Sequence, residues 1–214
     1  MPIPGNFSPR SVAPAFELPY KGDQIMAHIS KRKLHQYPLL VRLIFWAQRV
    51  KYGATLEPSF YWGRAPRILY GIQVLFRCLD RANSPLDPAL RALISNRIAQ
   101  LTHCEFCSDL SASTLRKKGV SEDKVLALGS FLTDPMFTAI ERTAISYAEA
   151  IVRDEREMME RRIQALREFF SESQIVELTG WICFQIFSSK FNAALDIPAQ
   201  GFCRVPYAAN ASSR

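Results

Sequence analysis

The sequence THCEFCSDLS, residues 102–111, holds two cysteines that are three positions apart, Cys104 and Cys107. Thr102 and Glu105 have the spacing of a capping box, in which each side chain bonds the backbone N–H of the other residue at the start of a helix. The spacing predicts that a helix begins here and carries both cysteines in its first turns. If the chain has redox chemistry, we expect it in this stretch.

Gly119 follows the basic run Arg116-Lys117-Lys118, a combination typical of a helix end, where cations are favourable. We therefore predict a helix over residues 103–118. Unpaired N–H groups and the macrodipole at its beginning favour a thiolate over a thiol. Cysteines in such places reach pKa values of about 3.5–7.5, against about 8.5 for a free thiol. One cysteine could attack a substrate and the other resolve the product as a disulfide, and helix position favours either equally.

Apolar residues recur at helical spacing along most of the chain, and neither β-type alternation nor an internal repeat is evident. These patterns predict an all-α fold, a compact helical bundle. Residues 175–191 are apolar nearly all round, which predicts a central helix or one in a subunit interface. The expected helical segments, besides 103–118, are 24–51 (with Pro38 in a first turn), 66–79, 88–101, 121–129, 134–151, 163–170 and 171–191.

The segment 53–62 is predicted to be a loop that brings Phe60, Tyr61 and Trp62 together. These aromatic side chains either pack between helices or form a pocket wall, and packing is the commoner case. Cys78 lies beside an apolar stripe and is predicted to be an inert core thiol.

The chain begins with a proline-rich stretch, residues 1–22, which predicts an extended arm that straps its own domain or a neighbouring subunit. Residues 153–162 are dense in both charge signs, a pattern typical of an exposed helix or linker without a binding role.

The 214-residue chain has a formal net charge of +7 that is concentrated in its first half. Residues 1–100 hold 14 Lys and Arg against 5 Asp and Glu, and the remainder holds 13 against 15. Without a recognition motif this indicates a solvated basic face, and we expect no nucleic-acid partner.

The apolar run 39–47 is interrupted by Arg42, so we expect no signal peptide or membrane span. Five cysteines are too few for a disulfide scaffold and suggest the reducing cytoplasm.

Several separate stretches together resemble the carboxymuconolactone decarboxylase family, and within it the alkylhydroperoxidase D-like branch. The resemblance covers about residues 60–203, and a CxxC pair in this helical order is fairly specific. The stretches are Leu86-Asp87-Pro88-Ala89-Leu90-Arg91, Cys104-Glu105-Phe106-Cys107 with Asp109, Glu141-Arg142-Thr143-Ala144, Tyr147-Ala148-Glu149-Ala150, Ile175-Val176-Glu177-Leu178-Thr179 and Phe191-Asn192-Ala193-Ala194-Leu195-Asp196-Ile197-Pro198.

The resemblance implies an alkylhydroperoxidase D-like helical domain at 60–203. It does not explain the proline-rich arm and helical extension at 1–59, and a tail at 204–214 follows the domain. The resemblance also implies a homo-oligomer whose cysteine pair reduces hydroperoxides and is re-reduced by a thiol or dithiol partner protein. No cofactor or metal is expected. In this scheme Cys107 attacks, becomes a sulfenic acid and is captured by Cys104.

The family's peroxidases add a proton relay, a glutamate twelve residues before the first cysteine and a histidine four after the second. Those positions are Ala92 and Ser111 here, and neither can act as the base. Ser111 could still hydrogen-bond a sulfur or a bound water. His103 is the neighbouring side chain with an unperturbed pKa near neutrality, and it is either an exposed histidine or a substitute base. The candidate catalytic residues are thus Cys104, Cys107, Ser111 and His103.

Three other interpretations remain at this stage. Loss of both relay residues would suit a non-enzymatic helical interaction protein that keeps the fold and the cysteine pair. Two thiolates are half of a structural zinc cage, but His28, His35, Cys183 and Cys203 are scattered along the sequence. Lactone decarboxylation needs no CxxC, and no constellation for it is evident. Cys203 is either a third redox partner or a packed thiol.

Overall fold

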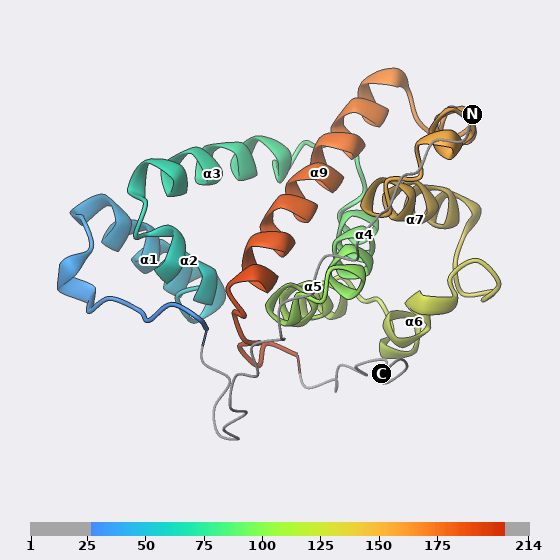
Figure 1. Ribbon diagram of the computed structural model, residues 1–214. Coiled ribbons are helices and arrows are strands. Elements are labelled where there is room, and N and C mark those ends of the chain that lie inside the picture. Colours follow the sequence, from blue (N-terminus) through green and yellow to red (C-terminus); the bar gives the residue numbers. More distant parts are fainter. Residues whose placement is uncertain (1–26, 204–214) are drawn as a thin grey trace, which may run out of the picture.

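The computed structural model describes residues 27–203, and these fold into α-helices joined by short loops and 3₁₀ turns, with no β-strand among them (Figure 1). The all-α prediction is confirmed. The predicted N-terminal arm and C-terminal tail lie outside the described residues. The α-helices are α1 (Leu39–Tyr52), α2 (Glu57–Trp62), α3 (Pro66–Leu79), α4 (Pro88–Leu101), α5 (Glu105–Lys117), α6 (Glu122–Leu126), α7 (Ala139–Val152), α8 (Met159–Leu166) and α9 (Glu172–Ala194).

The long helix α9 lies between two groups of helices, with α1, α2 and α3 on one side and α4, α5, α6 and α7 on the other (Figure 1). It contacts α3, α4, α5 and α7. Its apolar residues therefore face neighbours in several directions, which agrees with the predicted central position. One stripe, Val176, Cys183 and Phe187, stays exposed.

The central helix of the larger group is α4, which contacts α5, α7 and α9. Leu93, Ile94 and Ile98 on α4 are fully buried in the main apolar core. The start of α4 follows from the sequence, because the Asp87 carboxylate accepts the backbone N–H groups of Ala89 and Leu90, both at 2.8 Å. A helix fixed at its start and buried on nearly every side is a rigid support for the chain that follows it.

A second apolar cluster joins α1, α2 and α3 and contains Tyr37, Val41, Phe45, Trp62 and Leu69. It connects to α9 through the stacked rings of Trp62 and Phe191, whose centroids are 3.4 Å apart. The predicted packing of the aromatic residues between helices is therefore confirmed.

The prediction of a loop over residues 53–62 is wrong for residues 57–62, which form α2. Pro58 lies in the first turn of α2, where its missing N–H costs nothing. Gly63 ends α2 against the first helix, where a Cβ would lie 2.9 Å from the Ser59 carbonyl oxygen and 3.0 Å from atoms of Tyr37 and Val41. Apolar periodicity fails to reveal a six-residue helix that is buried on most sides.

The predicted helix 24–51 is also shorter than expected, since α1 begins only after Pro38 and the preceding described residues are irregular apart from a 3₁₀ turn, Leu34–Gln36. Cys78 is exposed on α3 rather than buried in the core, and Cys183 is exposed on α9. Both cysteines stand on helix faces that also carry exposed apolar residues, Val74 and Leu75 on α3 and Val176 and Phe187 on α9. Sequence periodicity cannot tell such a face from a core face.

Candidate functional site

The turn between α4 and α5 positions the cysteine pair, and it differs from the predicted one. Thr102 does not cap α5, since its hydroxyl donates to the Ile98 carbonyl at 2.7 Å and the residue ends α4. His103 then takes the left-handed conformation, φ 55°. This conformation is incompatible with a continuing helix, so the predicted start at residue 103 is wrong and α5 begins at Glu105.

The residue that caps α5 is Cys104 itself. Its Sγ accepts the backbone N–H of Cys107 at 3.2 Å, the bond that a serine or aspartate oxygen makes in an ordinary N-cap. At the other end, Gly119 has φ 77° and follows the last helical residues, as predicted. Both sulfur atoms therefore lie at the positive end of the helix dipole, which favours thiolates in the reduced protein.

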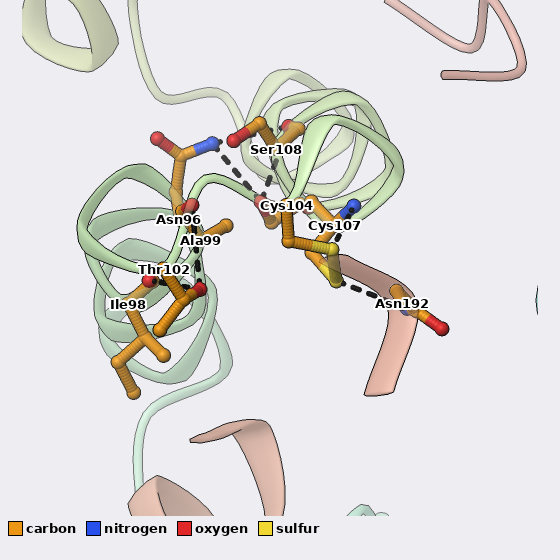
Figure 2. Close-up of a disulfide and its surroundings, with 9 residues drawn as sticks. Asn96, Ile98, Ala99, Thr102, Cys104, Cys107, Ser108 and Asn192 are labelled. Carbon is orange, nitrogen blue, oxygen red and sulfur yellow. Dashed lines mark hydrogen bonds between the residues drawn. A yellow bond between two sulfur atoms is a disulfide. The ribbon is translucent and has the colours of Figure 1, made fainter. Parts of the chain in front are cut away.

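Cys104 and Cys107 are joined by a disulfide, with Cα atoms 5.3 Å apart (Figure 2). Cys104 is only 2% exposed, whereas Cys107 is partly exposed. Tyr61, Ala99, Phe106 and Ile197 form a buried apolar cluster with Cys104. The two cysteines therefore differ in exposure, and Cys107 is the more exposed of the pair.

Tyr61, in the wall around Cys104, has a pKa above the ordinary value for tyrosine. Burial is the main cause, because it disfavours the phenolate, and the nearby negative charge of Glu57 adds to it. Glu57 is in turn paired with Lys31. Tyr61 is therefore a protonated, neutral wall residue near neutral pH.

A residue that the sequence analysis missed forms a hydrogen bond with the sulfur of Cys107. Asn192, near the end of α9, donates its Nδ2–H to Cys107 Sγ at 3.2 Å (Figure 2). It is 1% exposed, and its Oδ1 has no hydrogen-bond partner in the described part of the chain. Asn192 was visible in the sequence only as part of the Phe191–Pro198 stretch that carried the family resemblance, because 85 residues separate it from Cys107.

Ser111 is buried one turn after Cys107, but its hydroxyl faces the backbone. It donates to the Cys107 carbonyl at 2.6 Å and accepts from Asn96 Nδ2 at 2.9 Å. Asn96 also donates to the Ser108 carbonyl at 3.1 Å and accepts from Gln100 at 3.1 Å. This polar network ties α4 to α5 and ends on a carbonyl oxygen, so it holds the backbone of Cys107 and does not lead a proton to a sulfur.

Ala92, at the other relay position, lies in the apolar core at 5% exposed. His103 is exposed, and no hydrogen bond joins its side chain to either sulfur within residues 27–203. The four predicted site residues thus divide into the joined cysteine pair, a buried serine that supports it and an exposed histidine next to it in sequence.

Asp109, two residues after Cys107, binds the end of the described chain. Its carboxylate accepts the backbone N–H groups of Gln200, Phe202 and Cys203 at 2.6–3.0 Å. The Gln200 side chain in turn accepts from the Glu57 N–H and donates to the Thr55 carbonyl, both at 2.9 Å. The segment 197–203 is thereby fixed between α5 and α2. Cys203 keeps a free, partly exposed thiol.

Within the described range, 27–203, no three His, Cys, Asp or Glu side chains come close enough to hold a metal ion. Among the helices of that range, none has the length and apolar character needed to cross a membrane.

Comparison with known proteins places this geometry in a family. The model of the carboxymuconolactone decarboxylase family matches residues 73–150. The uncharacterized protein YnjA of Escherichia coli is 40% identical over 173 residues, which are 81% of this chain and 95% of YnjA.

Two solved structures share the fold. The core of an alkylhydroperoxidase AhpD, an uncharacterized peroxidase-related protein from Ralstonia eutropha, superimposes with a TM-score of 0.75 at 16% identity, covering 85% of this chain and 96% of that one. The debrominase Bmp8, in complex with 2,3,4-tribromopyrrole, gives a TM-score of 0.71 at 19% identity, covering 84% and 95%. The chain belongs to the carboxymuconolactone decarboxylase family and has the alkylhydroperoxidase D-like fold.

Proposed function

We propose that this protein is a thiol oxidoreductase that reduces hydroperoxides through a dithiol–disulfide cycle of Cys104 and Cys107. The observation that carries the proposal is the disulfide between them at the first turn of α5, with one cysteine buried and the other partly exposed. The alkylhydroperoxidase D-like fold supports the same chemistry. Such an activity would make the protein an antioxidant enzyme, and the reducing cytoplasm is the compartment that suits its dithiol form.

The proposed cycle assigns the attack to Cys107, since it is the more exposed cysteine of the pair. The Cys107 thiolate attacks the terminal oxygen of ROOH and the O–O bond breaks, which gives Cys107 sulfenic acid and, after uptake of one proton, ROH. The Cys104 thiol then attacks the Cys107 sulfur, so that the S–S bond forms and water leaves. A thiol or dithiol partner protein reduces the disulfide by thiol–disulfide exchange and becomes oxidised itself.

Ser111 and His103 take supporting positions in this proposal. Ser111 holds the Cys107 carbonyl, and with it the first turns of α5. His103 supplies the left-handed turn that lets Cys104 cap the helix. We infer that thiolate formation rests on the start of α5 and on hydrogen bonds to the sulfurs, in place of the family's glutamate and histidine.

We also propose that the protein forms a homo-oligomer. The outer face of α1 exposes Leu39, Leu43, Trp46 and Val50 at helical spacing, each at least 50% exposed. Monomeric proteins seldom leave so many large apolar side chains together in water. A second copy of the chain offers the same apolar face and is the partner that we expect to cover it.

The experiment is turnover of hydrogen peroxide and of an organic hydroperoxide with a dithiol reductant. Wild type is compared with Cys104→Ser and Cys107→Ser, and Cys183→Ser, an exposed thiol on α9, is the matched control. We expect either substitution in the pair to abolish turnover and the control to retain it. Turnover that survives in both pair variants would contradict the proposal.

The alternative is a non-enzymatic interaction protein, and the observation in its favour is that Ala92 and Ser111 leave no relay base beside the pair. Wild type that turns over neither peroxide, while both thiols remain titratable after reduction, would favour this alternative. In that case the exposed face of α1 becomes the first surface to test for a partner.

A further inference from the structure

Asn192 and Cys107 come from helices far apart in sequence, yet the Asn192 amide lies against the sulfur. The Nδ2–Sγ distance is 3.2 Å, and the close-up shows the asparagine on α9 directed at the disulfide on α5 (Figure 2). Asn192 is 1% exposed, so its amide is shielded from bulk water. The relationship exists because α9 packs against α5.

The chemistry of sulfur fixes the orientation of this amide. Neither a disulfide sulfur nor a thiolate carries a proton, so each can only accept, and the N–H side of the amide must face it. Asn192 Oδ1 is then buried with no partner in the described residues. An unpartnered buried oxygen costs free energy that an apolar side chain of similar size would avoid. The chain therefore carries a buried amide whose one side-chain hydrogen bond in the described structure is to the sulfur.

We propose that Asn192 is a thiolate-stabilising residue of the site. In the reduced protein its amide donates to the Cys107 thiolate, and a hydrogen bond to the charged form of a group favours that form. The pKa of Cys107 is lowered, so more of the nucleophile is present near neutral pH. Asn192 takes up no proton and is no base. By stabilising the thiolate, it partly compensates for the missing relay residues.

This inference deepens the proposed function and rests on it only in taking Cys107 as the nucleophile. The two sulfurs receive different donors, since Cys104 accepts the backbone N–H of Cys107, whereas Cys107 accepts the side chain of Asn192. A substitution at Asn192 therefore acts on one cysteine and leaves the capping bond of the other in place.

The test measures the pKa of Cys107 in the reduced protein from the pH dependence of its alkylation by iodoacetamide, followed on the Cys107 peptide by mass spectrometry. Asn192→Leu removes the donor at similar size, and we expect the pKa to rise by about one to two units. Asn192→Asp places a carboxylate beside the thiolate and should raise it further.

Ser189→Ala is the matched control. Ser189 is fully buried, lies one turn earlier on α9 and has a hydroxyl without a partner in the described chain. We expect its removal to leave the pKa of Cys107 unchanged. A wild-type pKa in Asn192→Leu, or an equal shift in Ser189→Ala, would overturn the proposal.

A second measurement uses no Asn192 variant, in case those variants fold poorly. The side-chain amide NMR signals of Asn192 in the reduced wild type should move with pH along the titration of Cys107, and should stop doing so in Cys107→Ser. Signals that stay constant through that titration overturn the inference. Neither readout uses a hydroperoxide, so failure of the peroxidase proposal and failure of this one are separate results.

Discussion

The Asp109 carboxylate accepts the backbone N–H of Cys203 at 2.6 Å, and so joins the helix that carries the cysteine pair to the last described residue of the chain. The N–H groups of Gln200 and Phe202 bind the same carboxylate. One buried side chain thus satisfies three donors of a loop that has no regular structure of its own. The loop covers the apolar cluster around Cys104 with Ile197 and Phe202.

We predict that Asp109→Ala lowers the free energy of unfolding by about 3 kcal/mol, because hydrogen bonds to a charged acceptor are the strong ones and three donors lose theirs. Asp109→Asn keeps one acceptor oxygen and should lose about half as much. Chemical denaturation measures the loss, and hydrogen exchange at residues 200–203 should rise in parallel. Glu105→Ala, an exposed carboxylate on the same helix, is the control. Equal stability of Asp109→Ala and the control would refute the role of this carboxylate.

Asn96 and Ser111 give a second prediction about stability. Asn96→Ala removes the two hydrogen bonds that the Asn96 amide donates to α5, and should destabilise the fold by about 2 kcal/mol. Ser111→Ala should cost about 1 kcal/mol and lower peroxide turnover only modestly, because the hydroxyl contacts a backbone carbonyl and no sulfur. Thermal denaturation and turnover are measured together, with Ser95→Ala as the control, since the Ser95 hydroxyl donates to the Arg91 carbonyl within its own helix. Turnover lost in Ser111→Ala at unchanged stability would instead place Ser111 in the chemistry.

His103 is tested by His103→Asn, since asparagine tolerates the left-handed backbone at this position. We expect nearly unchanged stability and turnover, because the side chain is exposed and bonds neither sulfur in the described structure. Loss of a general base would lower turnover by about 10²–10⁴-fold. The variant His35→Asn, another exposed histidine, controls for a general effect of the substitution. A large loss specific to His103 would make it the substitute base.

Ionisation of the buried Tyr61 side chain is expected to lower the stability of the folded state at alkaline pH. Burial, with the charge of Glu57, raises its pKa in the folded state above the unfolded value near 10. The folded state therefore favours the protonated phenol, a contribution that is complete below the unfolded pKa and is lost as pH rises through the folded pKa. We expect the Tm of wild type to fall more steeply above pH 10 than the Tm of Tyr61→Phe. Parallel curves from pH 9 to 11.5 would show that Tyr61 does not contribute.

The apolar face of α1 is tested by its effect on assembly. Trp46→Glu places a charge in the middle of the exposed stripe, and we expect it to shift the protein to a smaller species in analytical ultracentrifugation. Lys51→Glu, at the end of the same helix and outside the stripe, is the matched control. A wild type that sediments as a monomer at all concentrations would contradict the proposed homo-oligomer.

The sequence predicted those features that depend on neighbours in the chain. The helix start at Asp87, the helix end at Gly119 and the all-α fold follow from caps and apolar spacing, which act within a few residues. The same reasoning failed at Thr102, where a capping-box pattern lost to the left-handed turn at His103 and to a sulfur cap at Cys104. Thr102 and Cys104 are both possible caps for α5 and lie two residues apart. The chain must turn between α4 and α5 so that the two helices pack together, and this turn leaves Cys104 as the cap.

The cysteine pair itself was determined by the sequence alone, because two cysteines three residues apart at a helix start can reach each other through local geometry. Only the tertiary structure decided which sulfur is buried, that Ser111 faces a carbonyl, and that Asn192 lies against Cys107. These relationships depend on how α4 and α9 pack against α5. Contacts between residues 85 positions apart arise from the shape of the whole core, and no local pattern in the sequence encodes them.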